Sequence, residues 1–143
     1  MCWVVNNLSL LVYLSFGFLI SVSDVRSRLI RNRHLIAFLV SGLLLHLSIF
    51  SFSNLKSCFF VILICSILHL LFGGRIGAGD LKLFWVLSFW TIDFTEWLEG
   101  ITIVWLLGGL FAIIYLGFHW RNKPTELSIP FAPFIFLGFL PFV

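Results

Sequence analysis

Long apolar segments separated by short polar loops make up most of the chain. A helix that crosses a bilayer needs about 20 predominantly apolar residues, and the pattern predicts six such helices. Their expected ranges are 3–22, 35–52, 58–72, 81–90, 101–118 and 129–143. The fourth is short and the sixth contains prolines, so both are expected to tilt or to extend into the interface. The predicted fold is an all-α polytopic membrane protein, a bundle of about six transmembrane helices forming a single domain over residues 1–143.

Composition supports a membrane protein. Hydrophobic residues make up 61% of the chain and charged residues 10%, a balance that no soluble domain of this size needs. Phe and Trp, with 18 and 6 residues, suit contact with lipid and with the membrane interface. The formal net charge of +3 comes from basic residues in the loops, where it indicates orientation rather than nucleic-acid binding. Membrane lipid is therefore an expected partner, and nucleic acid is not.

Loop charges give the predicted bundle an orientation. Of the nine basic residues, all but Lys56 fall in loops that six spans place on one side: Arg26, Arg28, Arg31, Arg33, Arg75, Lys82, Arg121 and Lys123. The opposite side carries the acidic residues Asp93, Glu96 and Glu99. The positive-inside rule assigns the basic side to the cytoplasm, so both termini are expected outside.

The cysteines and histidines show no spacing typical of metal ligands. Cys2, Cys58 and Cys65 form no CxxC pair, so an apolar packing role is expected for them. His46 and His69 lie within apolar segments, where packing or a hydrogen bond to a neighbour is expected. No metal and no other cofactor is therefore predicted. The first segment lacks a basic N-terminal region, so we expect it to be retained as a helix rather than cleaved as a signal peptide.

Two carboxylates, Asp24 and Asp80, stand at the ends of apolar segments, where charge is costly. In the six-span topology both lie at the cytoplasmic side and so at the same membrane depth. Two carboxylates a few ångströms apart cannot both ionise easily, so they share a proton. The ionised member can then take a proton from water while the protonated member polarises a carbonyl, which is aspartic peptide-bond hydrolysis. The alternative is that each aspartate simply ends a helix at the interface.

Small residues precede the second carboxylate. Gly77 and Gly79 allow unusual torsions and close approach of another chain, so an extended substrate is expected to dock there. The alternative is a flexible loop that enters a helix. Lys82 does not face Asp80 on a regular helix, and it is expected to reach lipid phosphates or to steady the local charge. Gly108-Gly109 predicts close helix packing.

Polar residues also follow the first carboxylate. Arg28 and Arg31 lie four and seven residues after Asp24, so they share its face if the first helix continues. They are equally well explained as determinants of topology. Asn32 is a candidate N-cap of the second helix.

Three segments resemble motifs of the type IV prepilin peptidases. Gly77-Ala-Gly-Asp80-Leu-Lys82 is similar to their GxGDxK motif. Asp24-Val-Arg-Ser-Arg-Leu-Ile-Arg-Asn32 resembles their first-aspartate motif, although Arg31 stands where the family often has Pro or Ser. Ile129-Pro-Phe-Ala-Pro133 resembles the proline pair that opens their last helix. The motifs occur in the family's order and spread over nearly the whole chain.

The resemblance implies an aspartic endopeptidase of the bacterial inner membrane with Asp24 and Asp80 as its catalytic pair. Such enzymes need no cofactor and remove a short basic leader from prepilins or pseudopilins at the cytoplasmic face, where the substrate's apolar segment leaves the membrane. The other motif residues would bind substrate or shape the site: Gly77, Gly79, Lys82, Arg28, Asn32, Pro130 and Pro133. Larger members carry a cysteine-rich domain between the first two helices. Its absence here implies the small branch that serves tight-adherence (Flp) pili, and it puts methylation of the product in doubt.

Three other readings remain open. A presenilin-like protease also uses GxGD, but its partner aspartate follows a Tyr, whereas Ser23 precedes Asp24 here. A proton-coupled transporter is expected to place its charges near mid-membrane. An inactive peptidase homologue that acts as a scaffold for pilus assembly would not need the intact aspartate pair.

Overall fold

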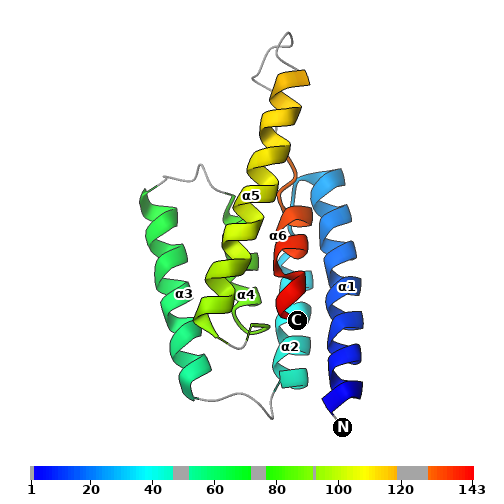
Figure 1. Cartoon of the computed structure of the whole chain (residues 1–143), viewed down its shortest axis with the longest axis vertical. Coiled ribbons are helices and arrows are strands. Elements are labelled where there is room, and N and C mark those ends of the chain that lie inside the picture. The colour runs from blue at the N-terminus through cyan, green and yellow to red at the C-terminus, as the bar shows by residue number, and fades with distance from the viewer. Residues whose placement is uncertain (1, 47–51, 72–76, 92, 119–128) are drawn as a thin grey trace.

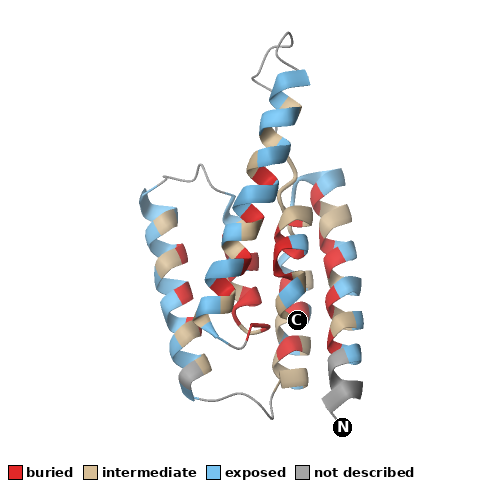
Figure 2. Ribbon diagram, in the orientation of Figure 1, coloured by how far each residue is buried: buried red, intermediate tan, exposed pale blue. Residues whose placement is uncertain are grey.

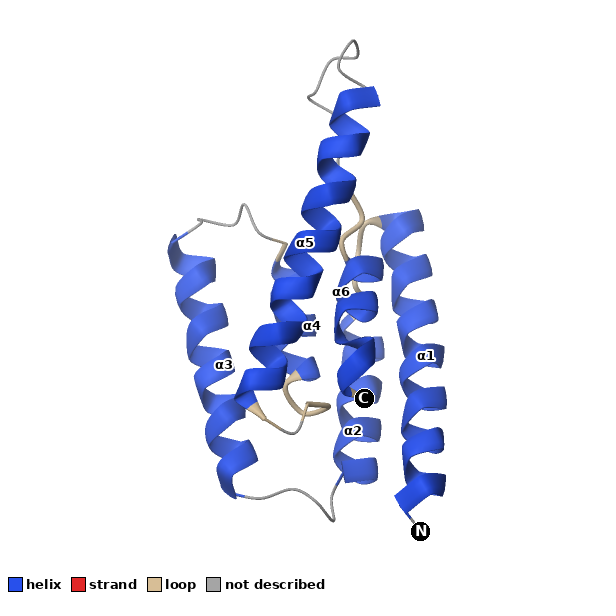
Figure 3. Ribbon diagram, viewed as in Figure 1, coloured by secondary structure: helices blue, strands red, loops and turns tan. Residues whose placement is uncertain are grey.

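The computed structural model describes residues 2–46, 52–71, 77–91, 93–118 and 129–143. These residues form helices joined by loops and turns, and no strand occurs among them (Figure 3). The helices are α1 (Cys2–Ser27), α2 (Asn32–His46), α3 (Phe52–Leu71), α4 (Ala78–Leu87), α5 (Phe94–Phe118) and α6 (Ala132–Phe139), and a 3-10 turn, η2 (Leu140–Phe142), follows. The predicted all-α polytopic fold is confirmed.

Three helices are long and apolar enough to cross a membrane. They cover Asn7–Ser27, Asn54–Leu71 and Phe94–Phe118, with mean hydropathies of 1.8, 2.0 and 2.3. The fourth and sixth helices are shorter than these three: α4 has 10 residues and α6 has 8. At 1.5 Å per residue, α4 is only about 15 Å long. The chain is a membrane protein in which α4 packs against α3 and α2, and α6 packs against α5 and α1.

The helices run up and down, so distant parts of the sequence meet at one end of the bundle (Figure 1). The end of α1 and the starts of α2, α4 and α6 lie toward this end, while both termini point toward the other. The predictions for Arg75, Arg121 and Lys123 fall outside the described residues.

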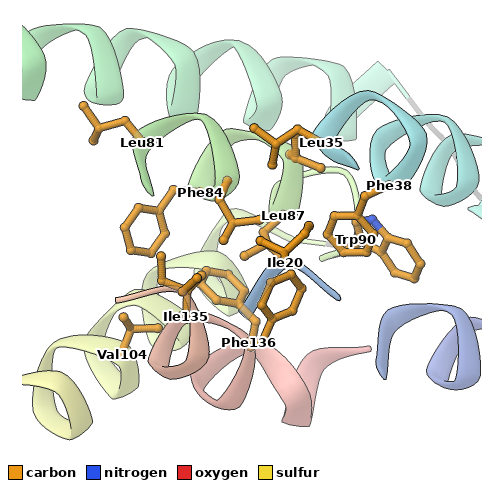
Figure 4. Packing of buried hydrophobic residues seen from close by; sticks show 14 of the residues in the cluster. Ile20, Leu35, Phe38, Leu81, Phe84, Leu87, Trp90, Val104, Ile135 and Phe136 are labelled. Carbon is orange, nitrogen blue, oxygen red and sulfur yellow. The ribbon is translucent and has the colours of Figure 1, made fainter. Parts of the chain in front are cut away.

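Aromatic side chains form the centre of the bundle. Phe38 of α2 stacks on Trp90 with ring centroids 4.7 Å apart, and Tyr13 of α1 packs edge-on against Phe136 of α6 at 5.4 Å. The Tyr13 hydroxyl donates a hydrogen bond to the Phe136 carbonyl at 2.8 Å. Figure 4 shows Phe38, Trp90 and Phe136 gathered beside Ile20. Burial is concentrated on these inner faces, while the outer faces of α3 and α5 are largely exposed, as suits contact with lipid (Figure 2).

His46, Cys58 and Cys65 pack against neighbouring residues of the bundle. His46 lies edge-on to Trp90 at 5.7 Å, and its Nε2 has no hydrogen-bond partner among the described residues. Cys58 and Cys65 are buried on α3, and the Cys58 thiol lies 3.6 Å from the Ser88 carbonyl oxygen. The apolar packing expected of these two cysteines is confirmed.

Glycines allow α5 and α6 to touch closely. A Cβ on Gly138 of α6 would overlap the Val104 side chain and would lie 2.9 Å from the Val104 backbone nitrogen. A Cβ on Gly108 would lie 2.6 Å from the Phe131 ring, whereas Gly109 has no atom within 4 Å of that position. The expected close packing is therefore correct for Gly108 and wrong for Gly109.

Gly138→Ala is expected to destabilise the bundle, because the new methyl group meets backbone that cannot move aside. The expected cost is about 1–3 kcal/mol, as for other overpacked sites. Gly109→Ala is the matched control: it adds the same methyl to a helix in open space and should be neutral or up to about 1 kcal/mol stabilising. Thermal unfolding in detergent micelles measures both. Equal stabilities of the two variants would contradict the packing of α5 on α6.

Candidate active site

Asp24 lies in the last turn of α1 and is buried, with 8% of its surface exposed. Its Oδ2 accepts a hydrogen bond of 3.0 Å from the backbone N–H of Ala132, the first residue of α6. The first N–H groups of a helix have no partner within the helix, so an acceptor from elsewhere satisfies one of them. The carboxylate therefore joins the end of α1 to the start of α6, 108 positions later.

The chain leaves α1 through a left-handed residue just after Asp24. Arg28 has a φ of 53°, and its N–H donates to the Asp24 carbonyl at 2.9 Å. Because the helix ends at Ser27, Arg28 and Arg31 do not continue along the face of Asp24. The condition for a shared face, that the first helix continues, is therefore not met, although both residues line the same pocket as the carboxylate.

Asp80 lies in the first turn of α4, where Gly77 is the N-cap residue. Gly77 has an ordinary backbone conformation, with φ −58° and ψ 124°, so unusual torsions are not the reason for a glycine here. A Cβ on Gly77 would instead lie 2.9 Å from Asp80 Oδ2. Gly77 thus leaves room for the carboxylate of Asp80.

Gly79 brings the start of α4 against the loop between α1 and α2. A Cβ at Gly79 would lie 3.2 Å from Cβ of Ile30, tighter than most side-chain contacts. The close approach expected at Gly79 is made by a segment of this chain, and docking of a substrate there stays a prediction. Gly79 therefore holds the second motif against the first.

Asp24 and Asp80 line one pocket of about 520 Å³. The rest of its lining comes from the loop between α1 and α2 and from the start of α4: Arg28, Leu29, Ile30, Arg31, Asn32, Gly77, Ala78, Gly79 and Lys82. Burial, followed by the negative charge of Asp24, raises the pKa of Asp80 to about 6. The two carboxylates therefore sense each other's charge within the same pocket.

Lys82 and Asn32 make a polar contact at the edge of this pocket. The Lys82 ammonium donates to the Asn32 side-chain oxygen at 3.3 Å. Asn32 is the first residue of α2, and the carbonyl of Arg31 accepts the N–H groups of His34 and Leu35. Arg31 thus holds the cap position expected for Asn32. The Lys82 side chain contacts Asn32, where the sequence predicted lipid phosphate.

Pro130 and Pro133, at the start of α6, do not line the aspartate pocket. Pro133 directly follows Ala132, whose N–H donates to Asp24. Pro133 is the second residue of α6 and has no N–H, and the N–H of Phe134 donates to the Phe131 carbonyl at 3.1 Å. The N–H of Ala132 is left to Asp24. Ala132 was not predicted from the sequence; the signal that could have found it is its place at the expected start of the last helix, where N–H groups lack partners within the helix.

A second, apolar groove of about 620 Å³ lies between α3 and α4. It is lined by Ile62, Cys65, Ser66, His69, Leu70, Ala78, Leu81, Lys82 and Trp85. Ala78 and Lys82 also line the pocket of the two aspartates, so the groove adjoins it. Within the described part of the chain, no three His, Cys, Asp or Glu side chains are grouped so that they could hold a metal ion.

Comparison with known proteins identifies the family. Residues 11–117, which include both aspartates, match the type IV leader peptidase family. Neither a curated protein nor a solved structure gives a significant match. Since the family match covers well over half of the 143 residues, the chain belongs to the type IV leader peptidase family.

Proposed function

We propose that the protein is a membrane-embedded aspartic endopeptidase that removes the short basic leader from type IV prepilins or pseudopilins. The observation that supports this best is that Asp24 and Asp80, from separate helices, line one pocket at one end of the bundle. Membership of the type IV leader peptidase family supports the class of substrate. The basic loop residues favour the cytoplasmic side for this end of the bundle, in a bacterial inner membrane.

The proposed reaction uses the two aspartates as a pair. One ionised carboxylate takes a proton from water, whose oxygen attacks the carbonyl carbon of the scissile bond. The protonated carboxyl group donates to the carbonyl oxygen and stabilises the charge that develops there. The raised pKa of Asp80, about 6, favours a pair that still holds one proton at mildly acidic pH.

The short connection between α1 and α2 supports an assignment to the small branch of the family. Only residues 28–31 separate the two helices, a gap too short for a cysteine-rich domain. We therefore place the protein with the small peptidases that serve tight-adherence (Flp) pili and have no methylase domain.

The apolar groove between α3 and α4 is the proposed site for the apolar segment of the substrate. It adjoins the aspartate pocket through Ala78 and Lys82. A helical segment in the groove would enter the aspartate pocket as it leaves the membrane. Ser66 lies on the wall of this groove, with its hydroxyl donating to the Ile62 carbonyl.

Asp24→Asn and Asp80→Asn are each expected to lower cleavage by at least about a hundredfold, because each removes one half of the acid–base pair. The measurement is loss of the leader, seen as a gel shift, from a co-expressed reporter with a short basic leader that ends in Gly before an apolar helix. Asp93→Asn is the control, because Asp93 is exposed and directly precedes α5, whose start lies at the opposite end of the bundle (Figure 1). Cleavage at the wild-type rate by either pocket variant would show that the pair is not catalytic, as expected of a scaffold or transporter.

Ser66→Trp is expected to lower the cleavage of the same reporter about tenfold, because an indole would fill part of the groove. Ser15→Trp is the matched control: Ser15 is also exposed on a long helix and also donates to the carbonyl four residues earlier. The groove assignment fails if both variants cleave equally well. Membrane insertion of both is checked by their yield in the membrane fraction.

A further inference from the structure

We infer that the first turn of α6 decides the roles of the two aspartates: Asp24 is the carboxylate that takes the proton from water, and Asp80 is the carboxylic acid that donates one. Ala132 is then a positioning residue, because its backbone N–H holds Asp24 in the charged form. This inference rests on the proposed peptidase function and assigns to each aspartate a role that the proposal leaves open. The residues matched to the family end at 117, so the contact from α6 lies outside that match.

The hydrogen bond from Ala132 favours the ionised state of its acceptor. A backbone N–H can only donate, and a hydrogen bond to a charged acceptor is about twice as strong as one to a neutral acceptor. The bond is 3.0 Å long and buried, so water does not compete with it effectively. The donor also lies at the N-terminus of a helix, where the macrodipole favours negative charge.

The start of α6 offers this donor to Asp24 alone among the described residues. Its first residue is Ala132, its second is Pro133, which has no N–H, and its third is Phe134, whose N–H donates to the Phe131 carbonyl. Of the first two residues of α6, only Ala132 therefore has an N–H, and this N–H donates to Asp24 Oδ2. The proline makes the start of α6 specific for one acceptor.

Asp80 has a different environment. Asp80 is half-buried and Asp24 more deeply so, but the carboxylate of Asp80 accepts no hydrogen bond from the described part of the chain that would offset its loss of water. Once Asp24 is ionised, its negative charge also opposes ionisation of Asp80. Burial and the neighbouring charge thus both keep the proton of the pair on Asp80.

Other charges that face the pocket do not reverse this assignment. Arg28 and Arg31, from the loop after α1, and Lys82, from α4, line the pocket and favour carboxylates in general. All three are exposed, so solvent screens them, and Lys82 donates to Asn32 rather than to an aspartate. The N-terminus of α4 favours the anion of Asp80, but the Asp80 carboxylate accepts no hydrogen bond from the residues that the structure describes there. Helix α6 contributes no titratable side chain.

The assignment gives a balanced reaction. Asp24 takes one proton from water as the water oxygen bonds to the carbonyl carbon, while Asp80 gives its proton to the carbonyl oxygen. In the resulting gem-diol the carbon–nitrogen bond then breaks. The nitrogen leaves with the proton held by Asp24, and one hydroxyl proton returns to Asp80. One water is consumed, a carboxylic acid and an amine are formed, and both aspartates recover their starting states.

The first test measures the protonation of the aspartate carboxyl groups directly, in the absence of substrate. Protein labelled with ¹³C at the aspartate carboxyl carbons is titrated by NMR in detergent, as wild type, Asp24→Asn and Asp80→Asn. At pH 5.5, the wild type is expected to show a carboxylic-acid signal with a midpoint near pH 6. Asp80→Asn is expected to lose this signal, and Asp24→Asn to keep it with a lower midpoint, because the charge of Asp24 is gone. The reverse pattern overturns the assignment. Because no cleavage is measured, a failure here is separate from a failure of the proposed function.

The second test removes the N–H of Ala132. Replacing the amide between Phe131 and Ala132 by an ester, with lactic acid at position 132, exchanges N–H for oxygen and keeps the side chain. The acid limb of the pH profile of reporter cleavage is then expected to move up by about 1–2 pH units, the size of a charge-assisted hydrogen bond. Ala132→Gly keeps the N–H and is the control, with an unmoved acid limb. An unmoved limb in the ester protein, or an equal shift in both, overturns the role of Ala132.

Discussion

The hydrogen bond from the Ala132 N–H to the Asp24 carboxylate is the contact on which the arrangement of the site depends. It joins the end of the first helix to the start of the last, next to the pocket that both aspartates line. Two other contacts hold α6 in the position that this hydrogen bond requires. One is the glycine-lined packing against α5, where Gly138 lies against Val104, and the other is the hydrogen bond from Tyr13 to the carbonyl of Phe136. The geometry of the aspartate pocket at one end of the bundle thus depends on close packing further along α6.

The two aspartates are placed by different means, and this difference gives the pair its chemistry. Asp24 sits in a helix that ends through a left-handed residue and accepts a buried N–H, whereas Asp80 begins a short helix beside a glycine that leaves it room. The contact of Gly79 with Ile30 keeps the two segments together. A carboxylate that accepts a hydrogen bond and a desolvated carboxyl group can share one proton unequally, as acid–base catalysis at a peptide bond requires.

Much of this arrangement follows from the sequence, because hydropathy and loop charge report the number and direction of helices. They place Asp24 and Asp80 at one end, and the motifs around them indicate the family that the comparison identifies. Hydropathy does not report how a loop turns or which side chains meet between helices. The turn at Arg28, the contact of Lys82 with Asn32 and the donor at Ala132 depend on local torsions and on packing between segments far apart in the chain.

Proximity of the two aspartates in the membrane-embedded protein is the central claim, and site-directed cross-linking tests it most directly. The double variant Asp24→Cys/Asp80→Cys is treated in membranes with a short bifunctional thiosulfonate, in a background with the native cysteines replaced by serine. The account predicts an efficient intramolecular cross-link in this protein and none in Asp24→Cys/Asp93→Cys, whose second site lies at the far end of the bundle. Equal cross-linking of the two proteins, or none in the first, would contradict it.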